Sequence, residues 1–235
     1  MQLLAKEAFS KAIGDFFSGE FLKLSILPIM IVSAIVFGVY FLGDFNLFSL
    51  GLMDHSSGWF GWIFNIPGVE WVVNTFLYIV TWGFLILLSV MLSIIVVGFF
   101  TPIIVKKVQK KHYHDIKLSS EFTFVKGVPH YLKIFFIFFT LLLITLPLAI
   151  IPGINLAILY LPFYYLFHNF LVLDVGSSIV SPKEFKELVK QNKATLRSST
   201  LLLYIVSLIP FSGILLQVFF VLVVAHEFFM MNRGS

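Results

Sequence analysis

The polar side chains that could do chemistry in this sequence stand beside breaks in long apolar stretches. Asn155 follows Pro152-Gly153, and Ser212 precedes Gly213 in a second proline break. Each residue could cap the helix that follows it, because its side-chain oxygen can accept a backbone N–H, or it could line a solute pathway. Two such breaks in one chain favour an anion-binding site, since the N-termini of interrupted helices direct positive dipole ends at an anion.

Basic residues at the ends of apolar stretches are a second set of candidates. Lys23 precedes the first stretch, and Lys193 and Arg197 precede the last one. Each side chain could snorkel to the membrane interface and anchor the topology, or its cationic head could contact an anion. The candidates for anion binding or for a pathway are Lys23, Gly153, Asn155, Arg197 and Ser212, with hairpin turns predicted at Pro152, Gly153, Pro210 and Gly213.

No set of residues for catalysis or for metal binding is predicted. The motif HEFFM, which contains His226 and Glu227, lacks the second histidine of the zinc-protease motif HExxH. The two histidines of HYHD (His112–Asp115) lie in a basic segment, where a solvated loop is favoured over a metal site. The chain has no cysteine that could act as a nucleophile or a ligand. We therefore expect no enzyme, no cofactor and no metal.

The composition indicates that most of the chain lies in a membrane. Of its 235 residues, 59% are hydrophobic and 12% are charged, whereas soluble domains carry about 25% charged residues. A soluble fold of this size could not hide so much apolar surface from water. The sequence therefore predicts an integral membrane protein.

Apolar stretches and their breaks set the positions of the candidate residues. The stretches are Leu24–Leu42, Val72–Val105, Ile134–Val172 and Thr200–Met230. The first two are long enough to cross a bilayer, which takes about 20 residues. The last two are broken by proline, which lacks an amide hydrogen, and by glycine, which adopts positive φ freely, so each is predicted to be a helical hairpin. The arm Thr200–Ile209 is too short to span, so its hairpin should penetrate only partway.

The predicted fold is an all-α polytopic membrane protein that forms a single domain over residues 1–235. It has two long transmembrane helices (24–42 and 72–105), two helical hairpins (134–173 and 200–230), at least one of them only partly penetrating, and an N-terminal amphipathic helix (1–23). That amphipathic helix is expected to lie on the cytoplasmic membrane surface. Its apolar face would consist of Leu4, Ala8, Phe9, Ala12, Ile13 and Phe16.

The distribution of positive charge predicts the topology. Lys106–Lys117 and Ser181–Arg197 are strongly basic, whereas Gly43–Trp71 holds no Lys or Arg. If both hairpins return to the side that they left, all 16 Lys and Arg lie on one side, which the positive-inside rule makes cytoplasmic. Both termini are then cytoplasmic as well.

Several short motifs give the chain a resemblance to a known family. IPGI (Ile151–Ile154) is followed by an aromatic helix and Asp174, then by SPKEFKELVKQNKA (Ser181–Ala194) and LIPFSGILLQVF (Leu208–Phe219). In this order they resemble the CysZ-type sulfate permeases of the etoposide-induced-protein family. The resemblance implies two crossing helices, two hemi-penetrating hairpins, an oligomer and inward passage of sulfate. Before the first crossing the family carries a Gly-Leu/Ile-Arg-Arg anion motif, where this chain has Glu20 and Lys23.

Together these observations predict a permease or channel-like protein for an inorganic anion, with sulfate as the implied substrate. The expected location is the bacterial inner (cytoplasmic) membrane, with a multi-pass topology. Membrane lipids and further copies of the chain are the expected partners, and nucleic acid is not expected to bind. The alternative is a non-transporting membrane scaffold or assembly factor whose hairpins shape the bilayer or bind a partner.

Overall fold

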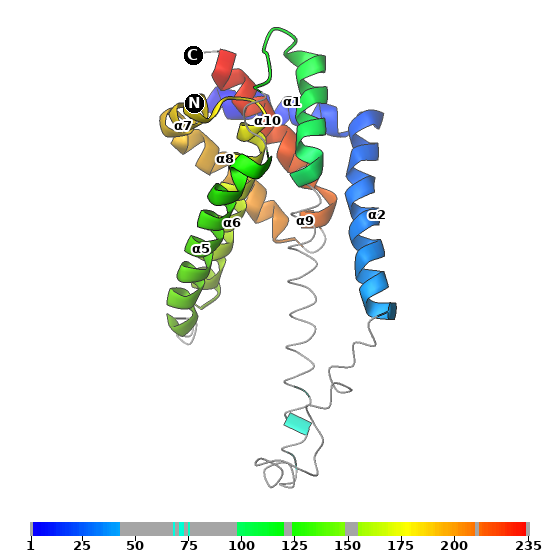
Figure 1. The fold of residues 1–235 in the computed structure, drawn as a ribbon, viewed down its shortest axis with the longest axis vertical. Coiled ribbons are helices and arrows are strands. Elements are labelled where there is room, and N and C mark those ends of the chain that lie inside the picture. Colours follow the sequence, from blue (N-terminus) through cyan, green and yellow to red (C-terminus); the bar gives the residue numbers. More distant parts are fainter. Residues whose placement is uncertain are drawn as a thin grey trace. The chain divides into compact units, whose positions relative to one another are not determined.

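The computed structural model describes residues 2–42, 98–119, 124–148, 155–209 and 212–233, together with positions 68, 71, 72 and 75. Contacts divide the chain into two units, Met1–Ile26 with Val97–Ser235, and Leu27–Val96. The first unit contains every helix labelled in Figure 1 except the later part of α2.

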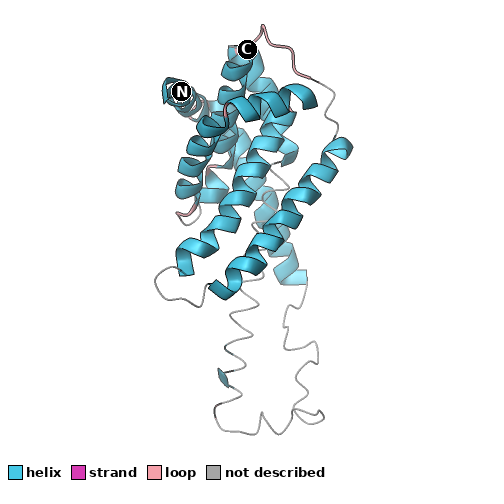
Figure 2. Cartoon of the chain, turned by 90° about the vertical axis from the view of Figure 1, so that its left-hand side faces the viewer, coloured by secondary structure: helices cyan, strands magenta, loops and turns pink. Residues whose placement is uncertain are grey.

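The described residues form helices and loops, with no strand among them (Figure 2). This confirms the predicted all-α class. The helices are α1 (Gln2–Phe16), α2 (Gly19–Leu42), the helical segment 98–112, α5 (Phe124–Leu148), α6 (Asn155–Ser177), α7 (Pro182–Gln191), α8 (Lys193–Ser207), α9 (Ser212–Leu215) and α10 (Gln217–Arg233).

Helix α10 is the centre of the first unit. Nearly all of its residues are buried, from Val218 to Met231, and helices α1, α6 and α8 pack against it (Figure 1). A helix that is apolar on all sides is stable only when it is covered on all sides. The apolar sequence of α10, together with its buried His226 and Glu227, therefore requires the surrounding helices.

Helix α1 supplies part of that cover, which differs from the expectation of a surface helix. Ala8, Ala12 and Phe16 are buried, and the Phe16 ring lies edge-on to Phe219 at a centroid distance of 5.7 Å. The apolar face of α1 is thus largely turned towards protein. The predicted single helix over residues 1–23 is also wrong in its extent, since α1 ends at Phe16 and α2 begins at Gly19.

A buried carboxylate fixes the end of α1. Asp15 is 2% exposed, and Lys111 Nζ donates to its Oδ1 at 2.7 Å. Burial alone would raise the pKa of Asp15, but hydrogen bonds from Lys111 and His112 and the charges of the nearby histidines hold that pKa below its usual value. The expectation of a solvated HYHD loop is therefore wrong for His112, which is half-buried, and for Tyr113, which is buried.

Helices α5 and α6 lie side by side as the two arms of the region predicted to be the first hairpin (Figures 1 and 2). Helix α5 begins at Phe124, ten residues before the predicted arm. Within it, Val128–Leu148 is the one helix among the described residues that is long and apolar enough to cross a membrane. Five of its exposed large side chains form a stripe, namely Leu132, Phe136, Phe139, Leu143 and Leu146. Residues 76–97 lie outside the described part, so the crossing over 72–105 stays a prediction.

Asp174 joins the helical segment 98–112 to the hairpin arms. Thr101 Oγ1 donates to its Oδ2 at 2.6 Å, and Tyr131 OH donates to its Oδ1 at 3.1 Å. Both carboxylate oxygens of this half-buried side chain therefore accept a hydrogen bond from the protein. These bonds fix the C-terminal half of α6, from which α7 and α8 continue.

Candidate anion-binding site

Helix α7 begins at a well-defined cap. Ser181 precedes it in an extended conformation, and Pro182 occupies the first helical position, where the missing amide hydrogen costs nothing. Glu184 Oε2 accepts from the Ser181 backbone N–H at 2.9 Å and from its hydroxyl at 2.8 Å. These contacts explain why the basic sequence that follows forms a separate short helix.

A hollow of ≈ 540 Å³ lies where α6, α7 and α8 meet. This is within the range of small-molecule sites, which is about 300–1,000 Å³. Its lining combines aromatic rings with side chains that donate hydrogen bonds. The lining residues are Tyr164, Tyr165, His168, Asn169, Phe185, Lys186, Val189, Lys190, Lys193 and Arg197.

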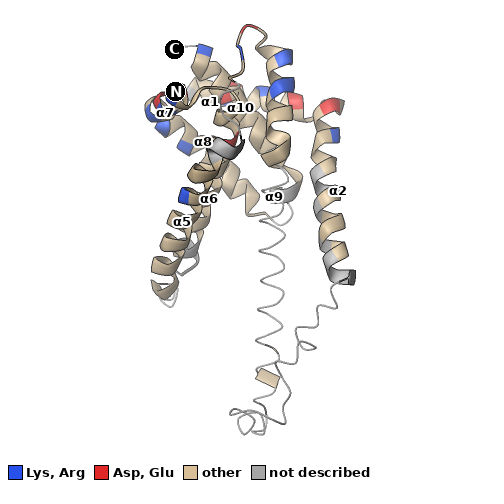
Figure 3. Ribbon diagram, viewed as in Figure 1, with Lys and Arg blue, Asp and Glu red and all other residues tan. Residues whose placement is uncertain are grey.

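Four of the lining residues are cationic and none is acidic. Lys186 and Lys190 are four residues apart on α7, and Lys193 and Arg197 are four apart on α8. A spacing of four places side chains on one face of a helix, so each helix presents two positive charges to the hollow. Figure 3 shows Lys and Arg gathered over α7. The electrostatic character of the hollow is that of an anion site.

Hydrogen bonds between α6 and α8 hold the side of the hollow that faces the core. His168 Nδ1 lies 2.7 Å from Thr200 Oγ1, and Tyr164 OH donates to the Arg197 carbonyl at 3.0 Å. Thr200 is fully buried, whereas the hydrogen bond from Tyr164 to Arg197 is exposed. These contacts fix the start of α8, and with it the backbone from which the Arg197 side chain extends.

The rings of Phe185 and Phe228 approach Gly176 closely, and this contact holds α7 in place. A Cβ at Gly176 would lie 2.5 Å from the ring of Phe185 on α7 and 2.7 Å from Phe228 on α10. The absence of that carbon lets the Phe185 ring stack on Phe228, with centroids 6.0 Å apart. Glycine is therefore needed at this position for its small size, and α7 depends on it.

The structure brings two of the basic candidates, Lys193 and Arg197, into the hollow. Lys23 is exposed on α2 and does not line it. Ser212 opens α9, and its hydroxyl donates to the carbonyl oxygens of Val206 at 2.5 Å and Ile209 at 2.7 Å, so it closes the turn after α8. Asn155 is the first residue of α6 and Gly213 lies in α9. The side chain of Asn155 lies outside the described part, as do Pro152, Gly153 and Pro210.

The sequence did not single out Lys186, Lys190, Tyr164 or His168 as site residues. The spacing of the two lysines on an amphipathic segment was a usable signal, because it places both on one face of α7. No signal in the sequence joined that face to Tyr164 and His168. Their meeting depends on how α7 folds back across α6.

Comparison with known proteins gives one match. A family model described as sulfate transporter CysZ/etoposide-induced protein 2.4 matches residues 8–217. No curated protein and no solved structure matches the chain.

Proposed function

This chain belongs to the sulfate transporter CysZ/etoposide-induced protein 2.4 family, and from that premise we propose that it passes an inorganic oxyanion, sulfate in the first instance, across a membrane. The hollow between α6, α7 and α8 is the proposed site where the anion binds before or after its passage. The observation that carries this proposal is the lining, which has four cationic side chains and no carboxylate.

The free-energy cost of placing like charges side by side on α7 and α8 supports a bound anion. Like charges four residues apart on a helix destabilise it by about 0.2–0.5 kcal/mol per pair. Lys186–Lys190 and Lys193–Arg197 are two such pairs facing one hollow. A bound dianion would relieve both repulsions at once. Tyr165 and Asn169 add hydrogen-bond donors beside the charges, which suits an oxyanion with several acceptor oxygens.

The membrane setting is supported by α5 and by the charges. The apolar stripe of α5 is exposed over its whole length, as a surface against lipid would be. Lys and Arg of the first unit gather towards the end where both termini lie, and the outer halves of α5 and α6 are without them (Figure 3). By the positive-inside rule that end is proposed to face the cytoplasm of a bacterial inner membrane, as are the termini.

The expected contribution of each cation follows from Coulomb's law. Two unit charges about 4 Å apart interact by about 1 kcal/mol in water, so one cation gains about 2 kcal/mol from a dianion. Arg197→Gln and Lys190→Gln should therefore each weaken sulfate binding roughly 10- to 30-fold. Lys183→Gln is the matched control, because Lys183 is on the same helix as Lys190 but does not line the hollow.

The test is uptake of radiolabelled sulfate into proteoliposomes made of phosphatidylcholine, which has no net charge to compete for the hollow. We expect uptake above that of empty liposomes, reduced by Arg197→Gln and Lys190→Gln and unchanged by Lys183→Gln. Lys23→Ala is a separate variant. It tests whether Lys23, the basic candidate that precedes the apolar stretch Leu24–Leu42 and does not line the hollow, contributes to sulfate uptake. Uptake equal to that of empty liposomes would reject the proposal and favour a non-transporting scaffold.

A further inference from the structure

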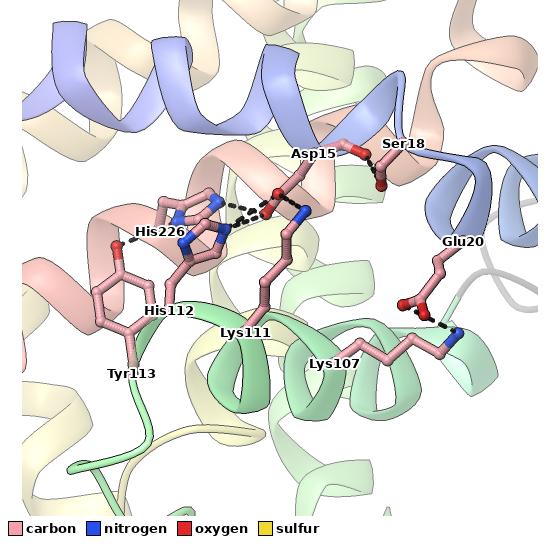
Figure 4. Close-up of polar contacts among 8 residues, drawn as sticks. All are labelled: Asp15, Ser18, Glu20, Lys107, Lys111, His112, Tyr113 and His226. Carbon is pink, nitrogen blue, oxygen red and sulfur yellow. Dashed lines mark hydrogen bonds and ion pairs between the residues drawn. The ribbon is translucent and has the colours of Figure 1, made fainter.

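Three helical elements bring one carboxylate and two imidazoles together away from the anion site. Asp15 comes from the end of α1, His112 from the end of segment 98–112, and His226 from the middle of α10 (Figure 4). One ligand atom from each residue lies within 4.8 Å of the others. Asp15 and His226 are buried, and His112 is half-buried.

Both imidazoles present the same atom to the same carboxylate oxygen. His112 Nε2 lies 3.0 Å from Asp15 Oδ2, and His226 Nε2 lies 3.2 Å from it. Around a tetrahedral zinc ion with bonds of 2.0–2.1 Å, neighbouring ligand atoms are about 3.3–3.4 Å apart. These two contacts need to lengthen by only a few tenths of an ångström to match that separation, and all three ligand atoms lie within 4.8 Å of one another.

The contacts behind the three residues are those that support metal ligands. Tyr113 OH lies 3.0 Å from His226 Nδ1, so it can accept the Nδ1 hydrogen when Nε2 is a ligand. Tyr113 is itself held by stacking on Phe229, at 4.7 Å between ring centroids. Lys111 Nζ donates to Oδ1 of Asp15, which His112 Nε2 also approaches at 3.0 Å, and Oδ2 is the oxygen that faces both histidines.

The surrounding charges limit which ion fits. Lys111 opposes a second cation, but it is 45% exposed and can shift towards water. Lys11 is paired with Glu7 at 2.9 Å. Two imidazole nitrogens and one carboxylate oxygen are a borderline-soft set that suits Zn²⁺ rather than Mg²⁺ or Ca²⁺, which prefer oxygen ligands.

We propose that Asp15, His112 and His226 form a site for one Zn²⁺ ion, with water in the fourth position. The ion would join α1 to α10 and to segment 98–112. It would thereby hold the N-terminal helix on the core of the first unit. This inference goes beyond the movement of anions and does not depend on it, because none of the three residues lines the hollow.

The test measures metal binding by the full-length, tag-free chain in detergent. Calorimetry with Zn²⁺ gives stoichiometry and affinity, and Co²⁺ serves as a spectroscopic probe because tetrahedral Co²⁺ has intense visible absorption. We expect one ion per chain and an increase in Tm with Zn²⁺. Tyr113→Phe should weaken affinity about 10- to 100-fold, and His112→Ala and Asp15→Asn should weaken it further.

His114→Ala is the matched control, because His114 belongs to the same HYHD motif but is exposed and outside the cluster. It should bind Zn²⁺ like the wild type. Asp15→Asn keeps the size of Asp15 and one acceptor oxygen but removes its charge, and circular dichroism checks that the variant remains folded. Absence of stoichiometric binding by the folded wild type, or equal affinity in wild type, Asp15→Asn and His112→Ala, would overturn the proposal.

Discussion

Gly176→Ala tests whether the position of α7 matters as much as its charge. The added Cβ would lie 2.5–2.6 Å from two ring carbons of Phe185 and 2.7 Å from Cζ of Phe228. Non-bonded carbons are most favourable at about 3.5–4.0 Å, so both rings are about 1 Å too close to the added carbon, and the side that yields more must move by about that distance. Phe228 is fully buried in the core, whereas Phe185 is only partly buried. We therefore expect Phe185 to move and α7 to move with it.

The magnitude follows from overpacking and from Coulomb's law. Overpacking of this kind costs about 1–3 kcal/mol, which corresponds to a fall in Tm of roughly 2–12 °C for a chain of this size. Moving Lys186 and Lys190 about 1 Å away from a bound dianion would lose about 0.4 kcal/mol for each lysine. Sulfate affinity should then fall about two- to fourfold, although no charge has been removed.

The assays are thermal unfolding in detergent and sulfate binding by calorimetry. Gly14→Ala is the control, because a Cβ there meets nothing within 4 Å and alanine favours a helix by up to about 1 kcal/mol. Adding Phe185→Ala to Gly176→Ala should cost less than the sum of the two single changes, since the nearer of the two clashing rings is gone. A Gly176→Ala variant with the Tm and the sulfate affinity of the wild type would show that the position of α7 does not depend on Gly176.

Three further expectations concern other parts of the fold. Glu227 is fully buried, Ser199 donates to its Oε1, and its Oε2 has no hydrogen-bond partner among the described residues. Glu227→Gln should therefore unfold within a few degrees of wild type, whereas Glu227→Ala should lose about 2–4 kcal/mol of stability in thermal unfolding. The hydrogen bonds from Arg233 hold the pKa of Asp115 below its usual value. The end of α10 should therefore be protected from hydrogen exchange at pH values above the ordinary carboxyl range, and this protection should be lost as the pH falls through the folded-state pKa. In Asp115→Asn the protection should not depend on pH in this way. If the α5 stripe contacts a second copy, Phe136→Cys in this cysteine-free chain should give disulfide-linked dimers in membranes, and monomers alone would count against the predicted oligomer.

The helical class was predictable because composition and apolar length depend on local sequence. The prediction for α1 failed where it depended on what covers a helix. Ala8, Ala12 and Phe16 have the spacing of an amphipathic surface helix, and the same spacing serves a helix buried on one side. Whether lipid or protein covers the apolar face of α1 depends on the position of α10, which lies more than 200 residues later in the sequence.

The residues of the candidate sites also divide into those that local sequence could predict and those that it could not. Arg197 was predictable from its place beside an apolar stretch, and Lys186 and Lys190 could have been found from their spacing. The cluster of His112 and His226 could not, since Asp15 is separated from them by 97 and 211 positions. Motif spacing reports on one helix, whereas these residues meet through the packing of three elements.

The central place of α10 has a consequence for how the protein is made. The ribosome synthesises α10 after every helix that packs on it, and at about 5–20 residues per second the 211 positions from Asp15 to His226 take roughly 10–40 s. During that interval the Asp15 carboxylate has no His226 partner, and the apolar face of α1 has no core to cover. A lipid surface or an insertion factor must therefore shelter α1 until the last helix arrives. Biogenesis of this unit is completed from its C-terminal end.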